Sequence, residues 1–138
     1  MPPYFYQGMN PSKPSILLIN GSASTHSSNG NLLKWMENYL CKSLNVVWMD
    51  SLKSLPHFDP ELSLEHTPQE ILSIRKQIEE ASAVLIVTPE YVFSIPSGLK
   101  NAIEWCVSTT IFTDKPTALI TASAHGVKGH EELQLLMR

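Results

Sequence analysis

The amino-acid sequence predicts an α/β fold in which helices cover both faces of a doubly wound parallel sheet. Four short apolar runs lack the alternation of half-exposed strands, which is typical of strands buried on both faces. Between these runs, apolar residues recur at helical spacing. The sequence has no hairpin signal, so we expect the helices to connect the strands, as they do between parallel strands.

The predicted elements alternate in the order βαβαβαβα. The strands are the apolar runs at residues 15–20, 46–49, 83–87 and 117–121. The first helix contains Leu32, Leu33, Met36, Tyr39 and Leu40, and later helices are predicted at residues 97–106 and 129–137. In such sheets, ligands bind outside the carboxyl ends of the strands. The loops after the first, third and fourth strands are therefore the candidate binding loops.

The second helix has the clearest predicted start. Thr67-Pro68-Gln69-Glu70 has the form of a capping box with proline at the first helical position. Ile71, Ile74 and Ile78 then follow at the spacing of one helical face. We therefore expect these isoleucines to continue the helix on one face.

Length and composition indicate one ordinary globular domain. The chain has 138 residues, 43% of them hydrophobic and 17% charged. Residues 1–14, rich in proline, are predicted to be an N-terminal arm or leader, and residues 15–138 the folded domain. The net charge of -3 argues against nucleic-acid and anionic-membrane partners, which need a basic surface. No signal peptide or membrane-spanning run is recognised, so we expect a cytoplasmic protein.

The cysteines and histidines predict neither a disulfide nor a metal site. Cys41 and Cys106 form no CxxC pair, and we expect both to be small buried groups in helices. His125 and His130 are five residues apart, which is the wrong spacing for one helical face.

The first candidate loop, residues 21–30, follows a strand and opens a helix. Its backbone N–H groups and the positive end of the helix would favour an anion, and the hydroxyls of Ser22, Ser24, Ser27 and Ser28 add donors. The loop matches neither a Walker motif nor a GxGxxG turn. The alternative is that the serines and Asn29 only cap the helix.

The second candidate loop, residues 88–96, places Tyr91 and Phe93 between two prolines. These aromatics would form a rigid wall for a planar ring, or would simply cover the end of the sheet. Glu90 and Lys100 either pair and brace the loop or remain two solvated charges. The third loop, residues 121–129, has small residues that allow a ligand close to the backbone.

These loops carry a resemblance to a known family. The run TPEYVFSIPSGLKNAIEW resembles the TPEYNxSIPGxLKNAxDW signature of the NAD(P)H-dependent FMN reductase family, which includes quinone, azo-dye and chromate reductases. The first loop is similar to the family's GSxRxxSxN phosphate loop at Gly21, Ser22, Ser27 and Asn29. The segments LPHFDPEL and ITASAHGVKG are similar to two further loops, so the resemblance runs from Ser15 to the C-terminus.

The resemblance implies a flavodoxin-like fold with strand order 2-1-3-4, and a binding site for FMN. The implied phosphate residues are Ser22, Ser24, Ser27 and Asn29. The residues implied to line the flavin ring are Pro89, Glu90, Tyr91, Val92, Phe93 and Ser94, with Ser123 and His125 nearby. NADPH or NADH would reduce the flavin, which would pass the electrons to a free flavin, quinone, azo compound or metal oxyanion. No catalytic side chain is named, and a homodimer or homotetramer is implied.

The sequence departs from the family pattern in two places. Ser24 stands where the family usually has arginine, which removes a charged phosphate partner. The chain also stops inside the fourth helix, whereas the family continues through a fifth strand. We therefore expect the strand at 117–121 to have an open edge that pairs with another chain. Two alternatives remain. One is an FMN-binding electron carrier, but such carriers are usually strongly acidic, and the net charge here is only -3. The other is a flavin-free interaction module.

Overall fold

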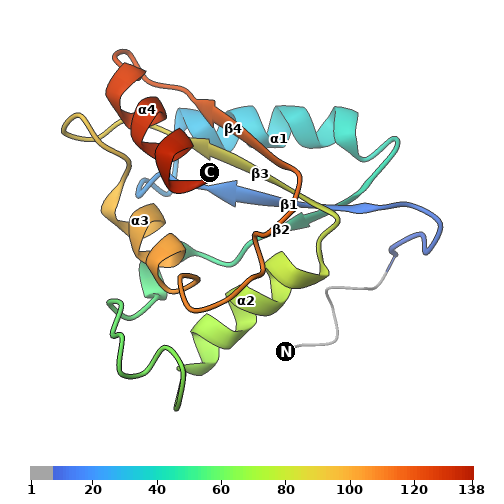
Figure 1. Cartoon of the computed structure of the whole chain (residues 1–138). Coiled ribbons are helices and arrows are strands. Elements are labelled where there is room, and N and C mark those ends of the chain that lie inside the picture. The colour runs from blue at the N-terminus through green and yellow to red at the C-terminus, as the bar shows by residue number, and fades with distance from the viewer. Residues whose placement is uncertain (1–7) are drawn as a thin grey trace.

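The computed structural model describes residues 8–138, and it has the predicted α/β architecture. The elements are β1 (Ser15–Asn20), α1 (Ser28–Leu40), β2 (Asn45–Trp48), the short 3-10 helix η2 (Leu52–Ser54), α2 (Gln69–Glu80), β3 (Ala83–Thr88), α3 (Ser97–Glu104), β4 (Thr117–Thr121) and α4 (Val127–Leu136). The strands form one parallel sheet in the order β2-β1-β3-β4 (Figure 1). The predicted fold class and strand order are confirmed.

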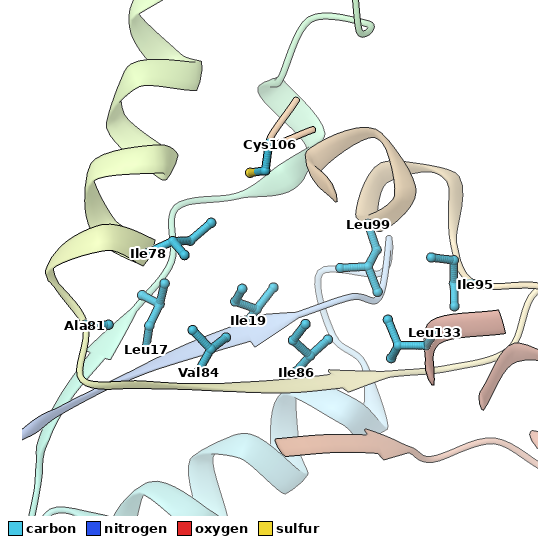
Figure 2. Close-up of a cluster of buried hydrophobic side chains, with 10 residues drawn as sticks. All are labelled: Leu17, Ile19, Ile78, Ala81, Val84, Ile86, Ile95, Leu99, Cys106 and Leu133. Atoms are coloured by element: carbon cyan, nitrogen blue, oxygen red, sulfur yellow. The ribbon is translucent and has the colours of Figure 1, made fainter. Parts of the chain in front are cut away.

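The two faces of the sheet are covered unequally. On one face, Leu17 and Ile19 of β1 and Ile86 of β3 pack with Ile78 of α2 and Leu133 of α4 (Figure 2). On the other face, Leu18, Leu85 and Val87 form a cluster with Leu33 of α1. Alternate residues of each central strand thus point to opposite faces, and both sets are buried. Such strands show no polar alternation, which explains why the unbroken apolar runs predicted them.

The capping box predicted at the start of α2 is wrong. Pro68 occupies the N-cap position, which has no side-chain hydrogen bond. The Thr67 hydroxyl instead donates to Leu62 O at 2.9 Å. Because Thr67 lies one residue before the cap, its hydroxyl reaches back into the preceding loop. Ile71, Ile74 and Ile78 lie in α2 as predicted, and none is more than 2% exposed. Ile78 packs with residues of the sheet, whereas Ile71 and Ile74 pack beside α3.

The long segment between β2 and α2 is held by side chains of α3 and the residue after it. The Asn101 amide accepts from Phe58 N at 2.8 Å and donates to Pro56 O at 2.9 Å. Trp105, fully buried, donates its indole N–H to Pro56 O at 2.8 Å. These bonds satisfy backbone groups that have no strand partner, and they keep the loop after β2 beside α3.

Both cysteines lie just past a helix, and only one is buried. Cys106 is 6% exposed, and this burial raises the pKa of its thiol to about 11, although the nearby Arg75 charge acts in the opposite direction. Cys41 is exposed at the end of α1, so its predicted burial is wrong.

The predicted N-terminal arm lies partly outside the described residues, since residues 1–7 are not described. Of the remainder, Asn10 and Lys13 accept hydrogen bonds from the Asn45 amide through their backbone carbonyls, at 2.8 and 2.9 Å. The Lys13 ammonium donates to Lys42 O at 3.0 Å, just beyond α1. Residues 10–13 are thus attached to the start of β2. Within residues 8–138, no helix is long and apolar enough to cross a bilayer.

Candidate functional site

The three candidate loops leave the sheet side by side. In the strand register, Asn20 of β1 lies opposite Val87 of β3, and Thr88 lies opposite Thr121 of β4. The pairing continues one step beyond the strands, because Gly21 N donates to Val87 O at 2.8 Å. The carboxyl ends of β1, β3 and β4 therefore bring the loops together at one edge, as predicted for a parallel sheet.

The first loop is folded by short polar side chains. Asn20 Oδ1 accepts from Ser22 N at 3.0 Å, and Ser22 Oγ accepts from Ser24 N at 3.2 Å. Ser27 is buried as the N-cap of α1, and its hydroxyl accepts from Gly30 N at 2.9 Å. Ser27 thus caps the helix, and its predicted contact with a phosphate stays a prediction. Asn20 was missed, although a polar residue that ends a buried strand marks such a position.

Several donors of this loop remain available. In the described part of the chain, the backbone N–H groups of Ala23, Thr25 and His26 donate to no acceptor. The side chains of Ser24 and Ser28 are exposed. Free N–H groups beside a helix N-terminus, together with hydroxyls, are a donor set that suits an anion such as phosphate.

Asn29 connects the first loop to the third. Its Nδ2 donates to Ala122 O at 3.3 Å, and the residue is only 4% exposed. Its Oδ1 is buried and has no partner among the described residues. A buried acceptor without a partner is costly, so this oxygen leaves one hydrogen bond for a donor from outside residues 8–138.

The second loop is a tight two-residue turn. Tyr91 and Ser94 exchange backbone hydrogen bonds of 2.8 and 3.0 Å, and Val92 and Phe93 form the exposed tip with φ of 51° and 61°. The Tyr91 hydroxyl lies 3.2 Å from Ser22 Oγ, so it joins the first and second loops. Pro89 is buried at the base of the turn. Tyr91, 39% exposed, thus lies across the loop that follows β1, whereas Phe93 is 77% exposed at the tip of the turn.

Helix α4 holds the second loop through two carboxylates. Glu90 Oε2 accepts from Gly129 N, in the first turn of α4, at 2.8 Å. Glu132 Oε2 accepts from Ile95 N at 3.0 Å and from the Ser94 hydroxyl. The Ser94 hydrogen bond, then that of Ile95 N, holds the pKa of Glu132 below its ordinary value of 4.5, and the Lys100 ammonium acts in the same direction.

Of the two alternatives for Glu90 and Lys100, the pair does not form. Lys100 Nζ lies 3.7 Å from Glu132 Oε1, whereas the Glu90 carboxylate binds the start of α4. Glu132 is absent from the residues predicted from the sequence. It contacts Ile95 and Ser94, which precede it by 37 and 38 positions, so no local sequence pattern indicates these contacts.

The third loop contributes less. Ser123 and His125 are exposed, and neither is hydrogen-bonded to the first or second loop within residues 8–138. The two ends of the loop are linked, because His130 Nδ1 of α4 lies 2.9 Å from the hydroxyl of Thr121, which ends β4. The structure joins the first and second loops at Ser22 and Tyr91, and the first and third loops at Asn29 and Ala122 O, whereas Ser123 and His125 take part in neither contact.

A cavity of about 330 Å³ opens beside the first loop. It is lined by Ser22, Ser24 and Thr25 of the loop, by Lys53 of η2, and by Gly98 and Leu99 of α3. The segment after β2 thus forms one wall, because β2 neighbours β1 in the sheet. Lys53 is absent from the residues predicted from the sequence. A lysine soon after the strand that neighbours β1 is nevertheless a sequence signal for a cation near the first loop. A second hollow, lined by Phe58, Phe112 and Met137, lies elsewhere.

Val92 is strained by its backbone. A β-branched residue at positive φ is a conformational outlier, and such residues cost about 1–3 kcal/mol. Asparagine tolerates this region, so Val92→Asn is expected to stabilise the fold by about 1 kcal/mol in urea unfolding. The control is Val107→Asn, another exposed valine, whose φ is not positive. Equal effects of the two substitutions would contradict the assignment of strain to Val92.

The comparisons with known proteins agree with this arrangement. The profile of the NADPH-dependent FMN reductase family matches residues 14–138. The chain is 33% identical over 131 residues to a quinone reductase of Escherichia coli, with 91% of this chain and 68% of that protein covered. It is 36% identical over 123 residues to the NADH:(hydroxy)cinnamate reductase subunit CrdA of Vibrio ruber, covering 88% of this chain and 59% of that protein.

A solved structure shows the same fold. The flavoenzyme FerB of Paracoccus denitrificans, an NAD(P)H:(acceptor) oxidoreductase, superposes with a TM-score of 0.80 at 27% identity. The match covers 90% of this chain and 70% of FerB. The relatives are therefore longer than this chain. Since the family profile spans all but the first 13 residues, the chain belongs to the NADPH-dependent FMN reductase family.

Proposed function

We propose that the chain binds FMN and passes electrons from NADPH or NADH, through the flavin, to a small acceptor such as a quinone, free flavin, azo compound or metal oxyanion. The observation that carries the proposal is the junction of the first and second loops at Ser22 Oγ and Tyr91 Oη, 3.2 Å apart. This contact places the hydrogen-bond donors of the first loop, which suit an anion, beside the aromatic turn of the second loop. Relatives with flavin, quinone and nicotinamide in their names support this assignment.

The residues present fit the two ends of FMN. The free N–H groups of Thr25 and His26 and the Ser24 hydroxyl would hold the phosphate. The turn at residues 89–94 would support the ring, with its backbone orientation set by the bonds of Glu90 and Ser94 to α4. When bound, the flavin accepts a hydride from the nicotinamide and releases electrons to the acceptor. The protein would bind the flavin and orient it.

The turn that would support the flavin ring is exposed to solvent. Val92 and Phe93 are 91% and 77% exposed at the tip of the turn. A second molecule can therefore reach the face of a ring that rests on this turn. Open access suits a reductase that must admit a nicotinamide and then an acceptor of variable shape.

The visible spectrum of the purified protein with added FMN tests this function. A retained yellow flavin that is bleached by NADPH or NADH without oxygen, and recovers its colour with a quinone, is the expected result. A protein that retains no FMN would contradict the proposal and favour the flavin-free module. FMN that is retained but not reduced by either nicotinamide would identify an electron carrier.

We also propose a cytoplasmic homodimer or homotetramer. The similarity to the NADPH-dependent FMN reductase family supports such an assembly. Sedimentation of the purified chain should then show a dimer or tetramer, and a monomer would overturn this part of the proposal.

A further inference from the structure

The first loop provides donors for a phosphate but carries no permanent positive charge. From Gly21 to Asn29 its side chains are hydroxyl, amide, methyl and a single imidazole, and Ser24 stands where the family pattern has arginine. A phosphate monoester carries about -1.5 to -2 charges at pH 7. A cation nearby would strengthen its binding, because hydrogen bonds between charged groups are stronger than neutral ones.

Lys53 brings such a cation from another element. It lies in η2, directly after β2, and its Nζ donates to Thr25 Oγ1 at 3.1 Å across 28 residues of sequence. Lys53 and Thr25 line the same cavity as Ser22 and Ser24. The ammonium group is thus fixed at the first loop by a contact that orients it toward the hydroxyls.

No ion pair neutralises the charge of Lys53 within residues 8–138. In the described part of the chain, the ion pairs involve Lys76, Lys100 and Lys128, so no carboxylate lies within ion-pair distance of Lys53. Asp50 lines the same cavity, but its Oδ2 accepts from Gln77 Nε2 at 3.2 Å. An ammonium group without a carboxylate partner, held beside free N–H donors, completes an anion site.

We propose that Lys53 is the cationic partner of the FMN phosphate in this protein, and that it supplies the charge that the loop lacks at Ser24. The inference rests on the proposed function, since it needs FMN in the first loop. It assigns phosphate recognition to two separate segments, the loop after β1 and the helix η2 after β2. Recognition of the flavin ring is independent of Lys53.

The test compares FMN with riboflavin, which has the same ring and no phosphate. Dissociation constants are measured from flavin fluorescence for the wild type, Lys53→Gln, Lys53→Arg and Lys34→Gln. Lys34 is an exposed residue of α1 with no hydrogen bond or ion pair in the described residues, so its substitution removes the same charge away from the cavity. Lys53→Gln should weaken FMN about tenfold and leave riboflavin unchanged.

Lys53→Arg should stay close to the wild type, Lys34→Gln should have little effect, and added salt should weaken FMN more in the wild type than in Lys53→Gln. Unchanged FMN binding in Lys53→Gln, or an equal loss for FMN and riboflavin, overturns the inference while the proposed function stands. A loss confined to the KM of NADPH also overturns it, by assigning Lys53 to the nicotinamide cofactor. A wild type that binds neither flavin overturns both proposals.

Discussion

Gly21→Ala is expected to destabilise the protein by about 3 kcal/mol and to displace the first loop. A Cβ at this position would lie 2.5 Å from Thr88 Oγ1, 2.7 Å from Thr88 Cβ and 2.9 Å from Leu99 Cδ2. Thr88 is fully buried and Leu99 is 1% exposed, so neither side chain has space to retreat. Urea unfolding gives the loss of stability, and FMN titration gives the effect on the loop.

Gly98→Ala is the matched control for this substitution. Gly98 lies in α3 beside the same cavity, but a Cβ there would meet only Leu52 Cβ, at 3.9 Å. Alanine has a higher helix propensity than glycine, so this variant should be as stable as the wild type or more stable by up to about 1 kcal/mol. Equal stability of the two alanine variants would show that the ends of β1 and β3 are not packed as tightly as described.

Glu132→Gln is expected to reduce stability by about 1–2 kcal/mol at pH 7 and to weaken flavin binding. The carboxylate accepts from Ile95 N and from Ser94, and it faces Lys100, so loss of its charge weakens all three contacts. The pKa of Glu132 is lowered in the fold. Its contribution to stability is therefore complete above the unfolded pKa, and it disappears as the pH falls through the folded pKa.

The pH dependence separates this effect from a simple loss of packing. The difference in unfolding free energy between the wild type and Glu132→Gln should shrink as the pH is lowered from 7 to below the ordinary glutamate value of 4.5. Glu131→Gln is the control, because within residues 8–138 Glu131 pairs only with the exposed Lys128 on the surface, where ion pairs contribute little. A difference that grows on acidification would refute the assignment.

Local pattern was sufficient to predict the sheet. A strand buried on both faces, such as β1 or β3, gives an unbroken run of apolar residues in the sequence. A helix with one buried face, such as α2, gives apolar residues at helical spacing. The loops at the strand ends followed from the chain order, because parallel strands place their carboxyl ends together. These features depend on sequence neighbours or on the order of the elements, and both are encoded in the linear chain.

The contacts that shape the site were not predictable in the same way. Lys53 reaches Thr25, and Glu132 reaches Ser94, across segments whose closeness depends on how η2 and α4 pack. The misread capping box at Thr67 has the related cause that its hydroxyl had a competing acceptor in the preceding loop. The partners of Lys53 and Glu132 lie 28 and 38 residues away and leave no pattern in the sequence, whereas the acceptor of Thr67 lies five residues away in a loop whose course the sequence does not indicate.

The two carboxylate contacts between α4 and the aromatic turn also constrain the order of folding. The turn at Tyr91–Ser94 is made early in synthesis, but its partners Gly129 and Glu132 follow 39 and 38 residues after the groups they bind. Contacts of such separation form after the local ones, because loop closure costs entropy. On the ribosome, β1, β2 and β3 are complete before α4 is available. A nascent chain paused before residue 127 would therefore hold the four strands and the aromatic turn without the α4 groups that bind the turn.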